Sequence, residues 1–159
     1  MTRGPAFCII TDKQTHLLTA ERIALWEEVW RLLMTAGEFK QELLKIYNAI
    51  NKQIFNVGVK QQNVDFVGNK IIIVSVNNRV PILKLLDEDY PDSTSHLDYL
   101  LSRVFKKQIR AALERQFQLN IVAVFKDYDA ETEYSGTIIY LDRDVEHYLK
   151  ELPELPARP

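Results

Sequence analysis

Three basic residues on one predicted helix have the spacing that best fits binding chemistry in this chain. Arg103, Lys107 and Arg110 follow one another at intervals of four and three residues, so a helix places all three on one face. Guanidinium and ammonium groups bind carboxylates and phosphates, which makes this face a candidate site for an anionic partner such as nucleic acid. A solvated helix face without a partner would show the same pattern.

The other chemically capable residues do not combine into a metal or catalytic site. His16, His96 and His147 lie far apart, and none has a second ligand at the spacing of a zinc site. The acids between Asp127 and Glu133 are spaced as in a calcium loop, but the glycine and the final glutamate of such a loop are missing. The sequence also contains no phosphate-binding loop and no dinucleotide fingerprint. We therefore expect a protein that is not an enzyme and that uses no metal and no cofactor.

The composition predicts one ordinary globular domain. The chain has 159 residues, of which 47% are hydrophobic and 26% charged, and its net charge is −2. This length is enough to bury a core, and the charge gives no overall basic field for nucleic acid. Cys8 is the single cysteine, which excludes an intramolecular disulfide and fits a reducing compartment. No apolar stretch approaches the roughly 20 residues of a membrane-spanning helix, so we expect a soluble cytoplasmic protein.

A hairpin near the middle of the chain is the clearest structural signal. Val64 and Phe66 alternate with polar neighbours, as in a half-buried strand. The pair Gly68-Asn69 tolerates the positive φ angles of a tight turn. Residues 71–76 are apolar on both faces, which is typical of a central strand that is covered above and below.

Two long helices flank this hairpin in the sequence. Thr35 and Glu38 form a capping box that begins a helix ending near Phe55, with Gly58 as its stop. Ser95, with Asp98 three residues on, is predicted to cap a longer helix that ends near Gln118. The predicted core side of this second helix consists of Leu97, Leu101, Val104, Phe105, Ile109, Ala112, Leu113 and Phe117.

The remaining elements complete two similar units. Strands are predicted at 121–125 and 136–141, and a short helix follows Asp142. The chain thus predicts an α+β fold in two layers, αββ-αββ, with a mixed four-stranded sheet and both long helices on one face. The strands before and after the longer helix should be parallel and joined by a right-handed crossover.

The ends of the chain are predicted to lie outside this domain. Residues 1–35 form an N-terminal extension with an extra helix that carries Trp26 and Trp30, residues 36–152 form the single α+β domain, and residues 153–159 form a loose tail. Two helices on one sheet face leave the other face apolar, and such a face is normally covered. Either the Trp26/Trp30 helix or a second copy of the chain would cover it, and we favour the homodimer.

The sequence of the two units resembles the DUF2294 family, also called the MpsC family. The matching features in the first unit are the helix end at Phe55 to Gly58 and the stretch QNVDFVGNKIIIVSVNNRVPILKLL. The second unit matches through its long helix, Phe117 to Val122, an acidic loop and SGTII. The resemblance covers about Glu38 to Asp142. This chain departs from the family pattern at Val59, where proline is frequent, and at Lys84, where an acid is frequent.

The family is named for a sodium-translocating, membrane-potential-generating system in bacteria. The resemblance therefore implies a non-catalytic accessory or interaction protein, the soluble partner of a bacterial membrane ion or inorganic-carbon transport system. It implies peripheral contact with a membrane transport protein, and it supplies no site residues. The alternative that the residues themselves leave open is a small nucleic-acid-binding regulator that uses the basic long helix.

Overall fold

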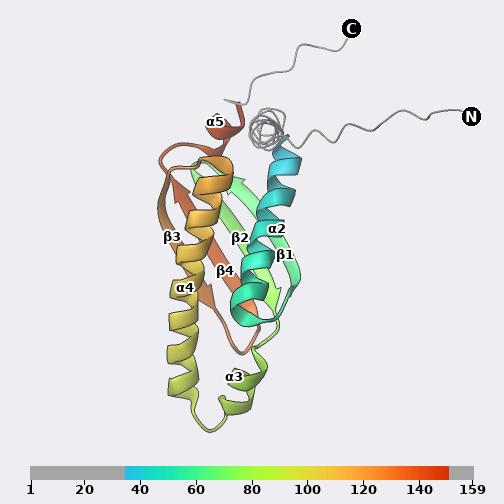
Figure 1. The fold of residues 1–159 in the computed structure, drawn as a ribbon, viewed down its shortest axis with the longest axis vertical. Coiled ribbons are helices and arrows are strands. Elements are labelled where there is room, and N and C mark those ends of the chain that lie inside the picture. The colour runs from blue at the N-terminus through green and yellow to red at the C-terminus, as the bar shows by residue number, and fades with distance from the viewer. Residues whose placement is uncertain (1–34, 151–159) are drawn as a thin grey trace, which may run out of the picture.

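In the computed structural model, which describes residues 35–150, two long helices pack on one face of a four-stranded sheet (Figure 1). This arrangement confirms the predicted α+β class and the placement of both helices on one face. The predicted helix with Trp26 and Trp30, together with Cys8, His16 and the tail at 153–159, lies outside the described residues.

Helix α2 (Ala36–Phe55) begins at the predicted capping box. The backbone N–H of Glu38 donates to the Thr35 hydroxyl at 3.2 Å, and the Thr35 backbone N–H donates to the Glu38 carboxylate at 2.7 Å. The helix ends at Asn56, whose φ of 55° is left-handed and whose N–H bonds to the Lys52 carbonyl. The predicted stop at Gly58 is therefore two residues late, because asparagine also tolerates the left-handed conformation.

The predicted hairpin is present as β1 (Val59–Val67) and β2 (Lys70–Asn77). Val67 pairs with Lys70, so Gly68 and Asn69 form a two-residue turn, and Gly68 has a φ of 57°. Val64 is buried while its neighbours Asn63 and Asp65 are exposed, which confirms the predicted alternation.

Replacing Gly68 with alanine should lower the free energy of unfolding by about 1–2 kcal/mol, because a β-carbon is strained at this φ. The added carbon would lie 3.5 Å from the Asp144 carboxylate, an ordinary contact, so backbone strain causes the loss. Gly136→Ala is the matched control, because a β-carbon there meets no atom within 4 Å. Urea denaturation of both variants measures the difference, and equal losses would refute this explanation.

Helix α3 (Pro81–Leu86) and helix α4 (Pro91–Phe117) follow the hairpin. The prediction that Ser95 caps the long helix is wrong, because α4 already begins at Pro91, whose fixed φ suits a first helical position. The predicted core positions Leu97 and Val104 are also wrong, with 41% and 47% of their surfaces exposed. Leu97 and Val104 lie on a different side of α4 from the fully buried Phe105 and Ile109, so the sheet does not cover them.

Strands β3 (Ile121–Tyr128) and β4 (Tyr134–Leu141) and helix α5 (Val145–Lys150) complete the described chain. The strand order is β1-β2-β4-β3, and every neighbouring pair is antiparallel. The predicted mixed sheet is therefore wrong. Strands β2 and β3 do run in the same direction, as predicted, but β4 lies between them, so they share no hydrogen bonds.

The two αββ units repeat in structural detail. Helix α4 ends on a left-handed Gln118, with a φ of 54°, as α2 ends on Asn56. Each first strand then has an irregularity at its start, between Val59 and Gln61 in β1 and between Ile121 and Ala123 in β3. The order of elements in the sequence already predicted two similar units, and the matching helix ends and bulges support that prediction.

The core lies between the helices and the sheet. Leu43, Ile71, Ile73, Phe105 and Ile139 are fully buried there. The opposite sheet face stays open among the described residues, and it exposes Val74, Phe125 and Tyr134. The cover predicted for that face, by the N-terminal segment or by a second copy of the chain, stays a prediction. Within residues 35–150, none of the helices has both the length and the apolar character needed to cross a membrane.

Candidate functional site

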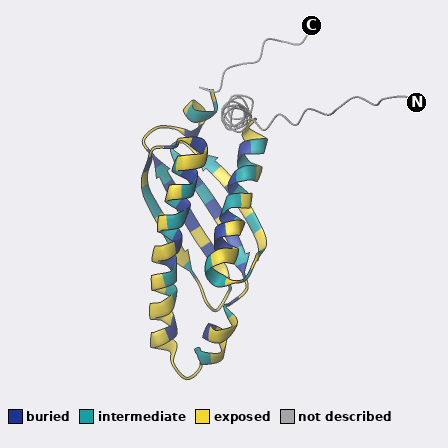
Figure 2. Ribbon diagram, viewed as in Figure 1, coloured by how far each residue is buried: buried dark blue, intermediate teal, exposed yellow. Residues whose placement is uncertain are grey.

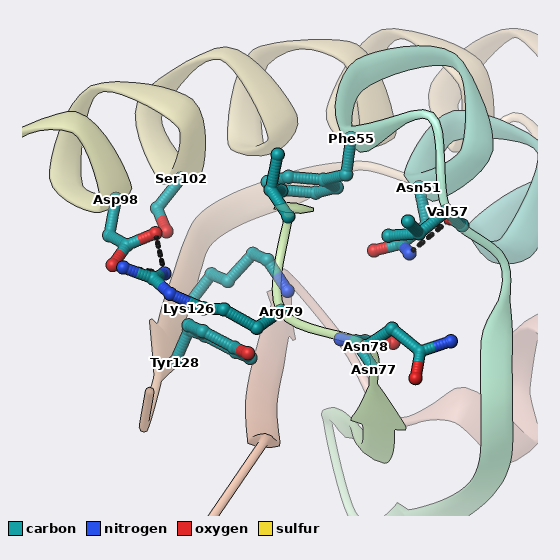
Figure 3. A pocket seen from close by; sticks show the side chains of 11 residues that line it. Asn51, Phe55, Val57, Asn77, Asn78, Arg79, Asp98, Ser102, Lys126 and Tyr128 are labelled. Carbon is teal, nitrogen blue, oxygen red and sulfur yellow. Dashed lines mark hydrogen bonds and ion pairs between the residues drawn. The ribbon is translucent and has the colours of Figure 1, made fainter. Parts of the chain in front are cut away.

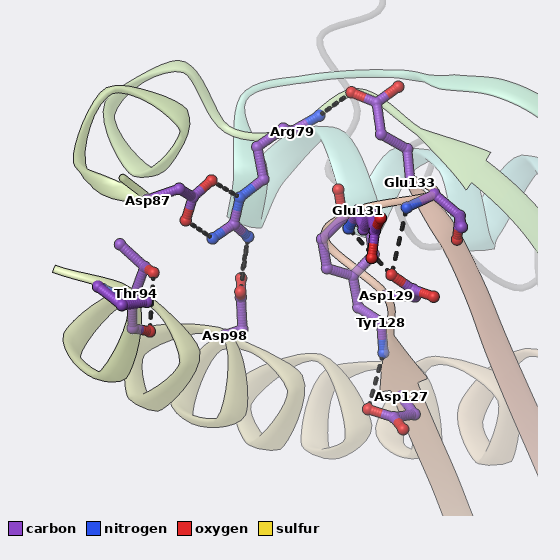
Figure 4. Close-up of polar contacts among 11 residues, drawn as sticks. Arg79, Asp87, Thr94, Asp98, Asp127, Tyr128, Asp129, Glu131 and Glu133 are labelled. Atoms are coloured by element: carbon purple, nitrogen blue, oxygen red, sulfur yellow. Dashed lines mark hydrogen bonds and ion pairs between the residues drawn. The ribbon is translucent and has the colours of Figure 1, made fainter. Parts of the chain in front are cut away.

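A buried arginine joins α3 and α4 to the end of the sheet (Figure 4). Arg79 follows β2, and its side chain is 3% exposed. Its Nε and Nη2 donate to the two oxygens of Asp87 at 2.8 and 2.7 Å, and its Nη1 lies 2.6 Å from both oxygens of Asp98. Asp87 ends α3 and Asp98 lies on α4. One guanidinium therefore holds both helices against the sheet.

A third carboxylate fixes the backbone at the same arginine. Glu133, from the loop before β4, accepts the Arg79 backbone N–H at 3.0 Å and binds Lys60 at 2.6 Å. The Arg79 hydrogen bonds hold the pKa of Asp87 below its usual value, and the Lys60 and Arg79 hydrogen bonds do the same for the pKa of Glu133. Both acids are thus stabilised in their charged forms.

The lowered pKa values predict a loss of stability in acid. An acid whose pKa is lower in the folded state stabilises the protein above its unfolded pKa, about 3.9 for aspartate and 4.3 for glutamate, and this stabilisation is lost as pH falls through the folded pKa. We expect the free energy of unfolding to fall with pH below about 4.5. Urea denaturation at several pH values measures the slope, which should be shallower in Asp87→Asn. An identical slope in that variant would contradict the assignment to Asp87.

A lysine enters the core beside this cluster. Lys126 on β3 donates to the Tyr47 hydroxyl at 3.1 Å and to the Ser135 hydroxyl at 2.6 Å, and its Nζ lies 4.3 Å from the Phe105 ring centre. Burial alone would raise the pKa of Tyr47, but the charge of Lys126 and the hydrogen bonds from Ser75, Thr137 and Lys126 outweigh it, so this pKa is lowered. Ser135 is buried and donates to the Asp127 carbonyl, so its hydroxyl is not free to attack a substrate.

Arg79 and Lys126 both line a small cavity (Figure 3). Its walls include the side chains of Asn51 and Asn77, which are 0% and 6% exposed. The Asn51 amide donates to the Val57 carbonyl and the Asn77 amide to Ser75, whereas the Oδ1 atoms of both asparagines have no hydrogen-bond partner. The cavity has a volume of about 20 Å³, which is enough for about one water molecule.

A wider cleft continues from this cavity toward solvent. It has a volume of about 400 Å³ and shares Asp98, Ser102, Lys126 and Tyr128 with the cavity. Burial raises the pKa of Tyr128, although the nearby Arg79 charge opposes that shift. The cleft is large enough for a small polar molecule. Asp129, in the acidic loop beside the cleft, stabilises the loop itself: its Oδ1 accepts hydrogen bonds from the backbone N–H groups of Glu131 and Thr132.

The structure separates the three predicted basic site residues. Arg103 and Lys107 are exposed on α4, and the Arg103 guanidinium lies 5.8 Å from the Tyr99 ring centre. Arg110 instead donates to the backbone carbonyls of Ile121 and Val122, at the bulge of β3. Two of the three cations therefore face solvent, and the third fastens α4 to the sheet. Binding of an anionic partner by this face stays a prediction.

Most of the exposed large apolar side chains of the described residues belong to α3, the loop after it and the first half of α4, which we call the arm (residues 81–104). Seven of the twelve exposed large hydrophobic side chains of the described chain belong to it: Ile82, Leu85, Tyr90, Leu97, Tyr99, Leu100 and Val104. Helix α3 and the first turns of α4 reach beyond the sheet, and Figure 2 shows mainly exposed residues there. Contiguous exposed apolar residues mark interaction surfaces more often than single ones do.

Sequence reasoning missed both Arg79 and Lys126. Arg79 closes the polar run Asn77-Asn78-Arg79 directly after an apolar strand, and Lys126 follows the apolar run of residues 121–125. A charged residue at the end of an apolar strand could therefore have identified both residues as candidates for the site. Their partners were not visible, because Asp98 lies 19 residues from Arg79 and Tyr47 lies 79 residues from Lys126.

Among the described residues, no group of three or more histidine, cysteine, aspartate or glutamate side chains could hold a metal ion. Comparison of the chain with protein-family models, curated proteins and solved structures finds no match.

Proposed function

We propose that this protein is a non-catalytic interaction protein that binds its partner through the arm. The observation that carries the proposal is the set of seven exposed apolar side chains of the arm. Burying a large apolar side chain contributes about 1.5–3 kcal/mol, so covering several of them supports a specific complex. The Arg79 cluster serves this role by holding α3 and α4 in a fixed position relative to the sheet.

The partner that we propose belongs to a bacterial membrane ion or inorganic-carbon transport system. The support is the resemblance of Glu38 to Asp142 to the MpsC family, which is named for a membrane-potential-generating system. The protein would then act at the membrane surface by contact with a transport protein.

Deletion of the gene, with measurement of membrane potential and inorganic-carbon uptake, tests this function. Deletion should lower at least one of the two, and the wild-type gene should restore it. The double variant Ile82→Ser/Leu85→Ser, which changes side chains that are 58% and 73% exposed, should fold but not restore it. Val122→Ser is the matched control, because this valine is 64% exposed but lies on β3.

Each outcome of this experiment has a defined meaning. If deletion changes neither quantity, the proposed link to transport is wrong. If the double variant restores function as well as the wild type does, the arm is not the binding surface.

The alternative function is nucleic-acid binding by α4, and one observation favours it. Arg103 and Lys107 are exposed one helical turn apart, so both can reach a phosphate backbone. The variant Arg103→Glu/Lys107→Glu should abolish salt-sensitive binding. In such binding, the logarithm of the association constant falls linearly with the logarithm of the salt concentration, with a slope of about −0.9 for each phosphate contacted. Absence of wild-type binding at low salt would eliminate this alternative.

A further inference from the structure

Helix α4 has a second apolar stripe, separate from the side that faces the core. Leu97, Leu100 and Val104 are 41%, 40% and 47% exposed. Their spacing of three and four residues puts them on one face of the helix. The core side of the same helix is formed by other residues, such as Phe105 and Ile109, which are fully buried. The stripe therefore has no cover within the described chain.

Charges of opposite sign lie at the two ends of this stripe. The exposed acids Glu88, Asp89 and Asp92 precede it, and the exposed cations Arg103 and Lys107 lie beside its later part. None of these five residues forms an ion pair with another described residue. The segment from Glu88 to Lys107 therefore has an acidic end and a basic end, and two copies of it are complementary when they run in opposite directions.

We propose that the partner of this stripe is a second copy of the chain, with the two α4 helices packed antiparallel about a two-fold axis at Leu100. An α-helix rises 1.5 Å per residue, so Lys107 lies about 10 Å from Leu100 and Asp92 about 12 Å from it in the other direction. In the antiparallel pair, Asp92 of one copy and Lys107 of the other thus stand at nearly the same height. Helical spacing also puts Asp92 and Lys107 on the same flank of the stripe, so two symmetric ion pairs form.

This inference rests on the proposed function and identifies one partner for the arm. It assigns the homodimer to α4 instead of the open sheet face. The two surfaces can be told apart, because Leu100 lies on the stripe and Val74 on the sheet. Both are exposed to a similar degree, 40% and 42%, so a charge at either position should be tolerated by the folded chain.

The first test is the mass of the full chain in solution, measured by sedimentation equilibrium over the micromolar range. The wild type should show twice the 18.5 kDa of one chain. Leu100→Glu puts two like charges at the two-fold axis and should weaken dimerisation by about 100-fold or more. Val74→Glu should leave the dimer intact. Loss of the dimer in Val74→Glu, with retention in Leu100→Glu, would overturn the proposal in favour of the sheet face.

The second test exchanges the charges at the two ends of the stripe. Lys107→Glu and Asp92→Lys each place like charges opposite one another, and each should weaken the dimer by about fivefold or more. The double variant restores opposite charges and should dimerise as the wild type does. Circular dichroism checks that each variant is folded. A double variant that is weaker than both single variants would contradict the antiparallel register.

The failure of this inference is distinguishable from that of the proposed function. A monomeric wild type combined with failed complementation by Ile82→Ser/Leu85→Ser would show that the arm binds a different protein. A stable dimer combined with unchanged transport in the deletion strain would support the α4 pairing and reject the link to transport.

Discussion

Replacement of Arg79 by methionine is expected to lower the free energy of unfolding by about 3 kcal/mol or more. Removing one member of a buried ion pair typically costs about 3–5 kcal/mol, because the remaining charge is left without a partner. Arg79 is 3% exposed, whereas Asp87 and Asp98 retain 35% and 19% exposure. Water can therefore partly solvate the two acids after the change, which places the expected loss at the lower end of the range.

The loss should be concentrated in the arm. Arg79 connects the end of β2 to both α3 and α4, so hydrogen exchange in α3 should accelerate more than exchange in β1. Arg79→Lys is the informative control, because lysine keeps the charge but cannot form paired hydrogen bonds with two carboxylates. It should give an intermediate loss in urea denaturation. A loss below about 1 kcal/mol in Arg79→Met would mean that the cluster does not hold the arm.

Replacement of Ile73 by alanine is expected to lower the free energy of unfolding by about 2–5 kcal/mol, the usual range for removing a buried aliphatic side chain. Ile73 is 0% exposed and lies on β2, between β1 and β4. Its side chain faces the two long helices, so the deletion leaves a cavity that close packing on both sides prevents from collapsing.

The neighbouring Val74 provides the control for Ile73. It lies on the same strand but points to the open sheet face, where it is 42% exposed. Val74→Ala should therefore cost well under half as much as Ile73→Ala in the same denaturation experiment. Similar losses for the two variants would show that the open face is covered in the full protein.

Local features of this fold could be predicted because the interacting residues are neighbours in the sequence. The capping box depends on Thr35 and Glu38, three residues apart, and the turn depends on the pair Gly68-Asn69. The alternation of Val64 and Phe66 with polar residues likewise predicted that β1 is half-buried, as it is. In each case the feature depends on residues that are close together in the chain.

The strand order and the site depend on contacts that the sequence does not encode locally. Asp98 matches a capping pattern with Ser95, yet its carboxylate binds Arg79, and Pro91 begins the helix instead. The same ambiguity applies to Arg110, which has the spacing of a binding face but bonds to the carbonyls of β3. Antiparallel pairing of β2 with β4 likewise joins segments about 60 residues apart, and hydrophobic pattern alone does not choose between neighbours.

The central position of the β2–β4 pairing has a consequence for synthesis of the chain. Strand β2 emerges from the ribosome after its first partner, β1. Its second partner, β4, consists of residues 134–141 and is synthesised later. At about 5–20 residues per second, this delay is roughly 3–12 s. During this interval the nascent chain presents an apolar strand edge with unpaired backbone groups, which can add a strand from another molecule. Two ribosomes on one message would bring such edges together, so we expect nascent chains to pair through β2 where translation slows between residues 78 and 133.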